Sequence, residues 1–187
     1  MREWPVILDP ALVLPLAWFL AATLAVAATH KVMRQREFML ALDGYGLTPR
    51  KFGPAIAYML ATAEAVCAAM LVVPALSSAG AIFAATIFGG YGIVMIQAIV
   101  RGRSGIDCGC HFGSQPSGLG WALVFRNAAL IGVAWLVALP MDRAGGWPDI
   151  VSGACAGLAL LLIQESGRIV LANREWIRAI RGASRHA

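Results

Sequence analysis

Charged residues are scarce in this chain. They make up 13% of its 187 residues, while 59% are apolar. A soluble globular domain carries about 25% charged residues, so this composition excludes an ordinary water-exposed globule. The net charge is +5, but the basic residues follow the apolar runs and fill the C-terminal tail, a distribution that suits a lipid surface rather than nucleic acid. The sequence also lacks internal repeats and low-complexity segments.

Cysteine is equally sparse. Four cysteines are too few for a secreted disulfide framework. Cys67 and Cys155 lie inside apolar runs, where we expect buried, inert thiols. Only Cys108 and Cys110 lie in a polar loop, where a reactive thiolate is tolerated. A second Cys-x-Cys or a His-x-His is absent from the sequence, and we expect no cofactor.

What the chain has in abundance is long apolar runs, which give it a mean hydropathy of +0.73. Five runs are long enough to cross a bilayer as helices. We predict spans at about 10–29, 54–73, 80–100, 120–139 and 149–172. The first run is as long as a span and has no obvious small-residue cleavage site, so we interpret it as a retained helix. The prediction is therefore an all-α, polytopic membrane helical bundle forming one domain over 1–187, with a basic tail at 173–187.

The connections differ strongly in charge. Segment 31–53 is basic, with a short helix expected at 35–42, followed by turns at 43–46 and 48–49. The side that holds this segment, the cysteine loop and the tail carries twelve basic residues, against two on the other side. The positive-inside rule then predicts the N-terminus outside and the cysteine loop at the cytoplasmic face. That orientation conflicts with a loop acting directly on an exported client.

Glu64 and Arg126 are charged residues that lie inside predicted spans. Glu64 is roughly 15 Å deep and Arg126 roughly 9 Å deep at 1.5 Å rise per residue. A lone charge at such depth costs about 2.5–3.5 kcal/mol on insertion scales, so we predict a Glu64–Arg126 pair, with a functional or a purely structural role. His30 and Lys31 close the first span on the same membrane face and are either tuning residues or plain interfacial anchors. Glycines 89, 90 and 92 are interpreted as close helix contacts.

The loop Asp107-Cys108-Gly109-Cys110-His111-Phe112-Gly113 is the main candidate site. Gly109 supplies the backbone freedom that a disulfide across one residue requires, and a strained, exposed bridge is more oxidising. Arg126 and His111 favour a thiolate, whereas Asp107 opposes it. The alternatives are a zinc or copper(I) site formed by Cys108, Cys110 and His111, and a cysteine pair without a function.

The ordered motifs of the chain resemble one known family. They are His30-Lys31, Phe38, Asp43-Gly44-Tyr45-Gly46-Leu47, Glu64, Asp107-Cys108-Gly109-Cys110-x-Phe112-Gly113 and Arg126-Asn127. Over residues 10–140 this combination resembles the MauE family of methylamine utilisation membrane proteins, related to the DoxX-like redox-associated group. The chain departs from the family pattern at His111, which is inserted between Cys-Gly-Cys and Phe-Gly.

The resemblance implies a four-helix DoxX-like core in the inner (plasma) membrane, to which span 149–172 adds a fifth helix. It also implies a thiol-disulfide oxidoreductase role in maturing the disulfide-rich small subunit of methylamine dehydrogenase, with a thioredoxin-like, MauD-type partner. Cys108 and Cys110 carry over as the redox pair, whereas His30, Lys31, Glu64, Arg126 and Asn127 carry over only as motif positions. From their chemistry, Glu64, Arg126 and His30 are candidate tuning residues. A non-catalytic membrane scaffold for a partner enzyme is the remaining alternative.

Overall fold

The computed structural model describes residues 7–46, 50–102, 120–143 and 145–183. Six α-helices and two short 3₁₀ helices account for nearly all of this part. The helices are α1 (Pro10–Met33), α2 (Gln35–Tyr45), α3 (Gly53–Val72), α4 (Ser77–Val100), α5 (Trp121–Ala138) and α6 (Trp147–Ala183). The 3₁₀ helices η1 (Arg50–Phe52) and η2 (Pro74–Leu76) precede α3 and α4. The described part contains no β-strand, so the all-α prediction is confirmed.

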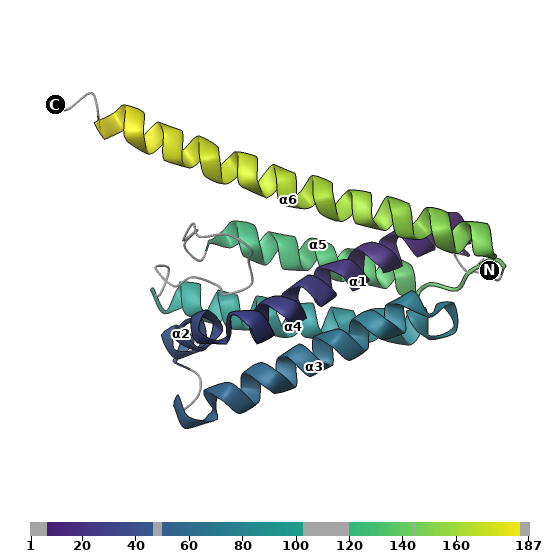
Figure 1. The fold of residues 1–187 in the computed structure, drawn as a ribbon, viewed down its shortest axis with the longest axis horizontal. Coiled ribbons are helices and arrows are strands. Elements are labelled where there is room, and N and C mark those ends of the chain that lie inside the picture. Colours follow the sequence, from purple (N-terminus) through teal and green to yellow (C-terminus); the bar gives the residue numbers. More distant parts are fainter. Residues whose placement is uncertain (1–6, 47–49, 103–119, 144, 184–187) are drawn as a thin grey trace, which may run out of the picture.

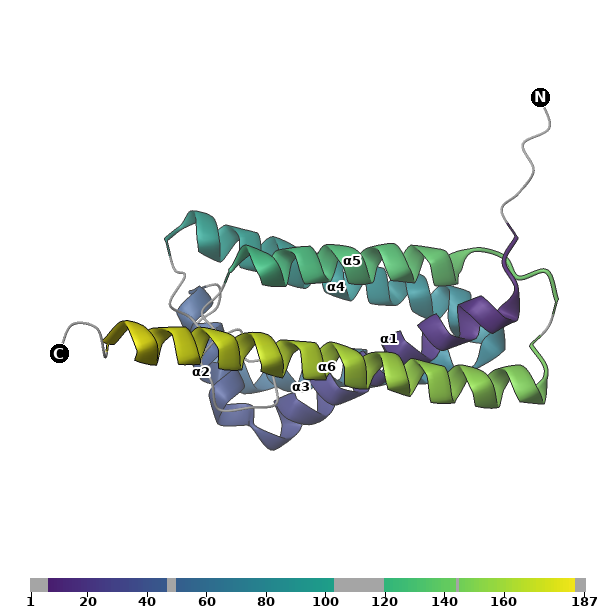
Figure 2. The ribbon, with the colours of Figure 1, turned by 90° about the horizontal axis from the view of Figure 1, so that it is seen from above.

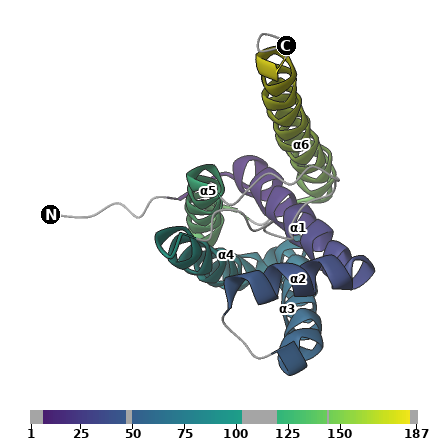
Figure 3. The same cartoon turned by 90° about the vertical axis from the view of Figure 1, so that its left-hand side faces the viewer.

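Five helices are long and apolar enough to cross a membrane, which confirms the polytopic bundle. Helices α1, α3, α4 and α5 run side by side along the long axis, and α2 lies across one end (Figures 1 and 3). The start of α1 lies at the opposite end from α2, and the last turns of α6 extend beyond the end that carries α2 (Figure 1). The two ends of the cysteine-containing connection, at the close of α4 and the start of α5, also lie at the α2 end.

The apolar helices enclose a large hydrophobic core, and a smaller cluster is formed by Tyr45, Met95 and Ala98. The largest fully buried apolar side chains of the bundle are Leu14, Leu20, Leu24 and Leu71. Around them, α1 packs on α3 and α6, and α4 packs on α5. Burying a Leu side chain contributes about 1.5–3 kcal/mol in water, but lipid is as apolar as Leu, so inside the membrane close packing and polar contacts provide the specificity.

Helix α6 attaches to the bundle through two glycines. A Cβ on Gly153 would lie 2.8 Å from the Cβ of Leu14, and one on Gly157 would lie 2.6 Å from the Cβ of Trp18. Spaced four residues apart, these glycines let the α1 and α6 backbones approach closely. Towards its C-terminal end α6 leans away from the other helices (Figures 1 and 3) and extends past them along the long axis (Figure 2).

The prediction that glycines 89, 90 and 92 make close helix contacts is wrong. A Cβ added at Gly89, Gly90 or Gly92 would meet nothing within 4 Å. The close approach between α3 and α4 is made instead at Gly80, where a Cβ would come within 3.0 Å of the Leu71 backbone nitrogen. The sequence shows only that a glycine would allow another helix to approach closely. Whether a neighbouring helix does approach depends on how the glycine's own helix is rotated in the bundle.

Capping fixes the end of the bundle that lies opposite α2. The Asp9 side chain accepts a hydrogen bond from the Ala11 amide at 2.7 Å, and Pro10 opens α1, a combination typical of helix N-termini. Arg143 bridges Asp9 at 3.4 Å and Asp149 at 2.6 Å. The hydrogen bonds with Asp149 raise the pKa of the Arg143 guanidinium above its ordinary value. The starts of α1 and α6 are thereby held together.

Two predicted boundaries next to α2 need correction, and the last helix continues past the predicted end at residue 172 to Ala183. The first span was expected to end at residue 29, but α1 continues to Met33 and takes in His30 and Lys31. Segment 43–46 was expected to be a turn, but α2 continues through Tyr45. It ends at Gly46, whose φ of 63° is readily adopted by glycine and whose amide donates to the Asp43 carbonyl at 2.9 Å.

Candidate functional site: a buried ionic network

Glu64 of α3 lies at the centre of a polar network inside the bundle. Its carboxylate accepts two hydrogen bonds from the Lys31 ammonium, at 2.8 and 2.9 Å, and one from the Tyr91 hydroxyl at 2.6 Å. The side chains of both Lys31 and Glu64 are 0% exposed. Charges removed from solvent in this way need both a partner and further hydrogen bonds, and this network supplies both.

Two aromatic rings enclose the ammonium of Lys31. The Nζ atom lies 5.3 Å from the centroid of the Phe38 ring and 5.1 Å from that of Tyr91. Both distances are within the range of cation–π attraction. Lys31 therefore connects four helices: its own α1, Phe38 on α2, Glu64 on α3 and Tyr91 on α4.

The direction of the side chains explains why Lys31 meets Glu64. Helical side chains lean toward the N-terminus of their helix. Lys31 lies at the end of α1, so it leans back into the bundle. Glu64 lies on α3, which enters from the same face, so it leans out toward Lys31. The two charged groups therefore converge from opposite directions.

The predicted Glu64–Arg126 pair is wrong. Arg126 makes no ion pair with Glu64 in the described part of the chain. Its helix α5 enters from the same face as α3, so Arg126 and Glu64 lean the same way and their difference in depth remains. The interpretation of Lys31 as an interfacial anchor is also wrong, because Lys31 is only 1% exposed.

Arg126 nevertheless lines the same small pocket as Glu64. The pocket has a volume of about 40 Å³ and is bounded by α1, α3, α4, α5 and α6. The buried Nε atom of Arg126 has no hydrogen-bond partner among the described residues. The polar side chains that line the pocket are Thr23, Glu64, Tyr91, Arg126, Gln164 and Glu165. Arg126 and Glu64 thus belong to one polar region, without direct pairing.

Of the other predicted site residues, His30 and Asn127 are neighbours in the sequence of Lys31 and Arg126. His30 is 2% exposed, next to Lys31 in α1. Asn127, also 2% exposed, donates a hydrogen bond to the Leu123 carbonyl at 3.0 Å and contacts the Met95 sulfur at 3.4 Å. Cys108, Cys110 and His111 lie outside the described residues, and so does the turn expected at 48–49. The described part contains no cluster of three or more His, Cys, Asp or Glu side chains suited to a metal ion.

The two cysteines predicted to be buried differ. Cys67 is fully buried, and its thiol donates to the Gly80 carbonyl at 3.2 Å, as expected for a core thiol. Cys155 is exposed on α6, so that prediction is wrong. Cys155 lies between Gly153 and Gly157, and these two glycines, not the cysteine, face α1.

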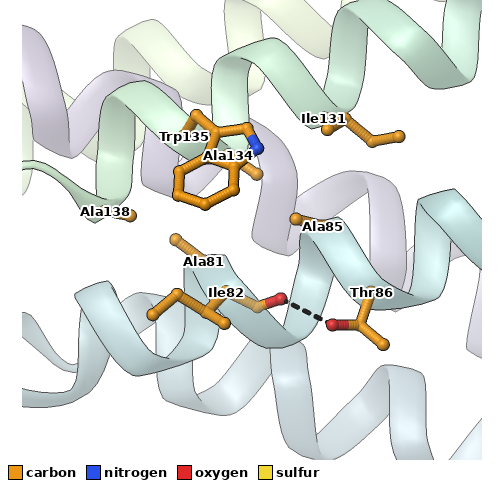
Figure 4. Close-up of a pocket in the computed structure, with 8 residues that line it drawn as sticks. All are labelled: Ala81, Ile82, Ala85, Thr86, Ile131, Ala134, Trp135 and Ala138. Atoms are coloured by element: carbon orange, nitrogen blue, oxygen red, sulfur yellow. Dashed lines mark hydrogen bonds between the residues drawn. The ribbon is translucent and has the colours of Figure 1, made fainter.

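A larger apolar pocket lies between α4 and α5 (Figure 4). Its volume is about 260 Å³, and alanines form much of its lining together with Trp135. Thr86 is its one hydroxyl-bearing residue, and that hydroxyl already donates to the Ile82 carbonyl at 3.0 Å. The pocket offers no ionisable group for chemistry, so the candidate site is the ionic network.

Five span-forming helices, together with a buried Lys31–Glu64 pair that the half-buried Tyr91 joins, define a small polytopic membrane protein with ionisable groups inside its bundle. The family model described as "Methylamine utilisation protein MauE" matches residues 9–140, and the chain belongs to this family. It is therefore a multi-pass membrane protein of methylamine utilisation.

Relatives support the same family over most of the chain. The methylamine utilization protein MauE of Paracoccus versutus is 36% identical over 167 residues, which cover 88% of this chain and 90% of the relative. The MauE protein of Methylorubrum extorquens is 35% identical over 150 residues, covering 78% and 80% respectively. No solved structure matches the chain.

Tyr91 is the functional-site residue that sequence reasoning missed. It lies in an apolar run, where a tyrosine is ordinarily a packing residue. A usable signal existed: a carboxyl buried in a span needs several donors, and Tyr91 is a donor at comparable depth on the neighbouring helix. Its depth follows from its position nine residues before the end of α4, about 13 Å below that end.

Proposed function

We propose that this protein is a thiol–disulfide oxidoreductase of the inner membrane, in which Cys108 and Cys110 form the exchanging pair. Its client in this proposal is the disulfide-rich small subunit of methylamine dehydrogenase, and its redox partner is a thioredoxin-like protein of the MauD type. Family membership supports the pathway. The cysteine pair supports the chemistry, because two thiols across one glycine can close and open a disulfide.

The observation that carries the proposal is the position of the ionic network relative to the cysteine-containing connection. This connection leaves α4 after Val100 and enters α5 at Trp121. Tyr91 lies about 13 Å below the first of these points and Arg126 about 8 Å below the second, at 1.5 Å per residue. The two helices that carry the loop therefore also carry members of the buried polar region.

In the exchange, a thiolate attacks one sulfur of a disulfide and forms a mixed disulfide, which the neighbouring thiolate then resolves. One S–S bond breaks and one forms, so two electrons pass between the loop and its partner without any other oxidant. Cations near the loop favour the thiolate. Arg126 lies near the start of α5 and can serve this role. Lys31 cannot, because Glu64 already neutralises it.

Trapping the mixed disulfide tests the proposal. Cys155 is exposed, so every variant is built in a Cys155→Ser background to remove its adducts. Cys110→Ser leaves Cys108 without its resolving thiol, and Cys108→Ser does the converse. One of these variants is expected to accumulate an adduct with the partner or client that dithiothreitol releases.

The double variant Cys108→Ser/Cys110→Ser serves as the control and is expected to form no adduct and to leave the client subunit without its disulfides. Absence of thiol-dependent adducts from both single-cysteine variants would reject the exchange mechanism. Normal client maturation with the double variant would instead favour a membrane scaffold. Stoichiometric zinc or copper that is lost on Cys108→Ala would favour the metal site.

A further inference from the structure

A second pocket lies at the α2 end of the molecule, apart from the ionic network. It is open, has a volume of about 430 Å³ and is formed where α2 faces the start of α3. Its lining combines a cation, an anion and apolar side chains: Arg36, Met39, Leu40, Asp43 and Gly53. A pocket with both charges and an apolar wall matches an amphipathic ligand.

The ends of the neighbouring spans are expected to place this pocket at the level of the lipid headgroups. Helix α1 ends at Met33 and α3 begins at Gly53, so the segment between them lies where spans leave the bilayer. Helix α2 crosses this end of the bundle (Figures 1 and 3). Met33 is 74% exposed, Leu40 65% and Phe52 50%. Exposed apolar side chains beside basic ones are typical of a helix lying in the membrane interface.

The two charged residues of the pocket are placed to bind two ends of one headgroup. Arg36 and Asp43 are seven residues apart, which is about two helical turns and about 10.5 Å along α2. That spacing puts them on one face of the helix. Arg36 makes no ion pair with any described residue, whereas the nearby Arg34 pairs with Glu37 at 3.3 Å. A guanidinium binds phosphate well, and a carboxylate has several acceptor positions for N–H donors.

We propose that this pocket binds phosphatidylethanolamine. Arg36 holds the phosphate, Asp43 accepts hydrogen bonds from the primary ammonium, and Met39 and Leu40 contact the first carbons of the acyl chains. Phosphatidylcholine has no N–H donor for Asp43. Phosphatidylglycerol has no cation, so Asp43 disfavours its net negative headgroup.

Lipid binding to the purified full-length protein tests this proposal. Delipidated protein in detergent is titrated with each of the three phospholipids, and bound lipid is counted by native mass spectrometry. Wild type is expected to retain phosphatidylethanolamine about tenfold better than the other two. Arg36→Ala is expected to lose about tenfold in phosphatidylethanolamine binding, and Asp43→Asn is expected to bind phosphatidylethanolamine and phosphatidylcholine alike.

Arg143→Ala at the opposite end is the matched control and is expected to bind like wild type. Soluble glycerophosphoethanolamine is expected not to compete, because it lacks acyl chains. Equal retention of the three lipids by wild type would overturn the proposal, and so would a preference for phosphatidylglycerol. Equal effects of Arg36→Ala and Arg143→Ala would do the same. Circular dichroism of each variant separates lost binding from lost folding.

Discussion

Lys31 shows how much a basic residue at the end of a span can differ from an interfacial anchor. Its ammonium is fully buried between a carboxylate and two rings. Replacing Lys31 by Met leaves Glu64 buried without its cation. Loss of one partner of a buried pair costs about 3–5 kcal/mol, so we expect Lys31→Met to lower the free energy of unfolding by that amount, measured by unfolding in SDS.

The matched control is Arg34→Met, which breaks an exposed pair with Glu37 and is expected to cost about 1 kcal/mol or less. The double variant Lys31→Met/Glu64→Leu removes both buried charges and is expected to recover part of the loss. If Lys31→Met is no more destabilising than Arg34→Met, the pair does not hold the helices together.

Tyr91 makes a separate and smaller contribution. Tyr91→Phe removes only the hydroxyl that donates to Glu64 at 2.6 Å. A hydrogen bond to a charged group contributes about 1.5–3 kcal/mol, and this is the expected loss in the same unfolding measurement. In the Lys31→Met/Glu64→Leu background, Tyr91→Phe is expected to cost much less, because its acceptor is gone. Equal costs in the two backgrounds would show that the bond is unimportant.

At the scale of elements, the contact between α1 and α6 depends on glycine. Gly157→Ala adds a Cβ 2.6 Å from the Trp18 Cβ and 2.8 Å from the Phe19 backbone nitrogen. Both atoms are fixed to the α1 backbone and cannot rotate away from the added methyl group. We therefore expect α6 to move away from α1. Disulfide cross-linking between cysteines placed on facing positions of the two helices is expected to fall sharply.

Gly132→Ala on α5 is the control for this substitution. Its added Cβ would meet nothing within 4 Å, and alanine favours a helix over glycine by about 1 kcal/mol. We therefore expect unchanged cross-linking and equal or higher stability. Intact cross-linking in Gly157→Ala would mean that α1 and α6 do not pack closely.

The elements themselves were largely predictable from the sequence, because a bilayer-length apolar run specifies a helix by length alone. All five predicted spans begin within three residues of their helices, and the first begins at the predicted residue, Pro10. The polar signals were misleading: His30 and Lys31 marked the end of a span where the helix continues, and 43–46 marked a turn inside α2. The clustering of glycines likewise predicted close helix contacts at residues 89, 90 and 92, whereas the structure has them at Gly153 and Gly157.

The site was predictable in part. Glu64 was recognised because an unpaired carboxyl inside a membrane is costly. Its partner was not, since depth along the helices favoured Arg126, whereas the lean of each side chain and the rotation of α4 select Lys31 and Tyr91. The lean of the side chains toward one another and the rotation of α4 depend on how the helices assemble. The spacing of residues within a single helix therefore does not predict them.

At the scale of the whole molecule, five spans place the cysteine connection and the C-terminus on one side and the N-terminus on the other. Even without the neutralised Lys31, nearly all loop and tail basic residues lie on the cysteine side. The positive-inside rule predicts that this side is cytoplasmic. In intact cells, a membrane-impermeant thiol reagent is therefore expected to spare Cys108 and Cys110 and to label an Arg143→Cys variant.

That experiment uses a Cys155→Ser background, and permeabilised cells confirm that the loop cysteines can react. Labelling of Cys108 or Cys110 in intact cells would place the loop outside, where it could act directly on an exported client. Protection of the loop would instead require that electrons cross the membrane before they reach such a client. Each result therefore assigns the loop to one side of the bilayer.

Reversible joining of the two loop sulfurs is measured most directly by a redox titration of the purified protein. The Cys67→Ser/Cys155→Ser variant is equilibrated in dithiothreitol buffers of stepped potential, then alkylated and weighed by mass spectrometry. A single two-electron transition between a doubly alkylated and an unalkylated form is expected, and Cys108→Ser is expected to abolish it. Two alkylations at every potential would contradict it.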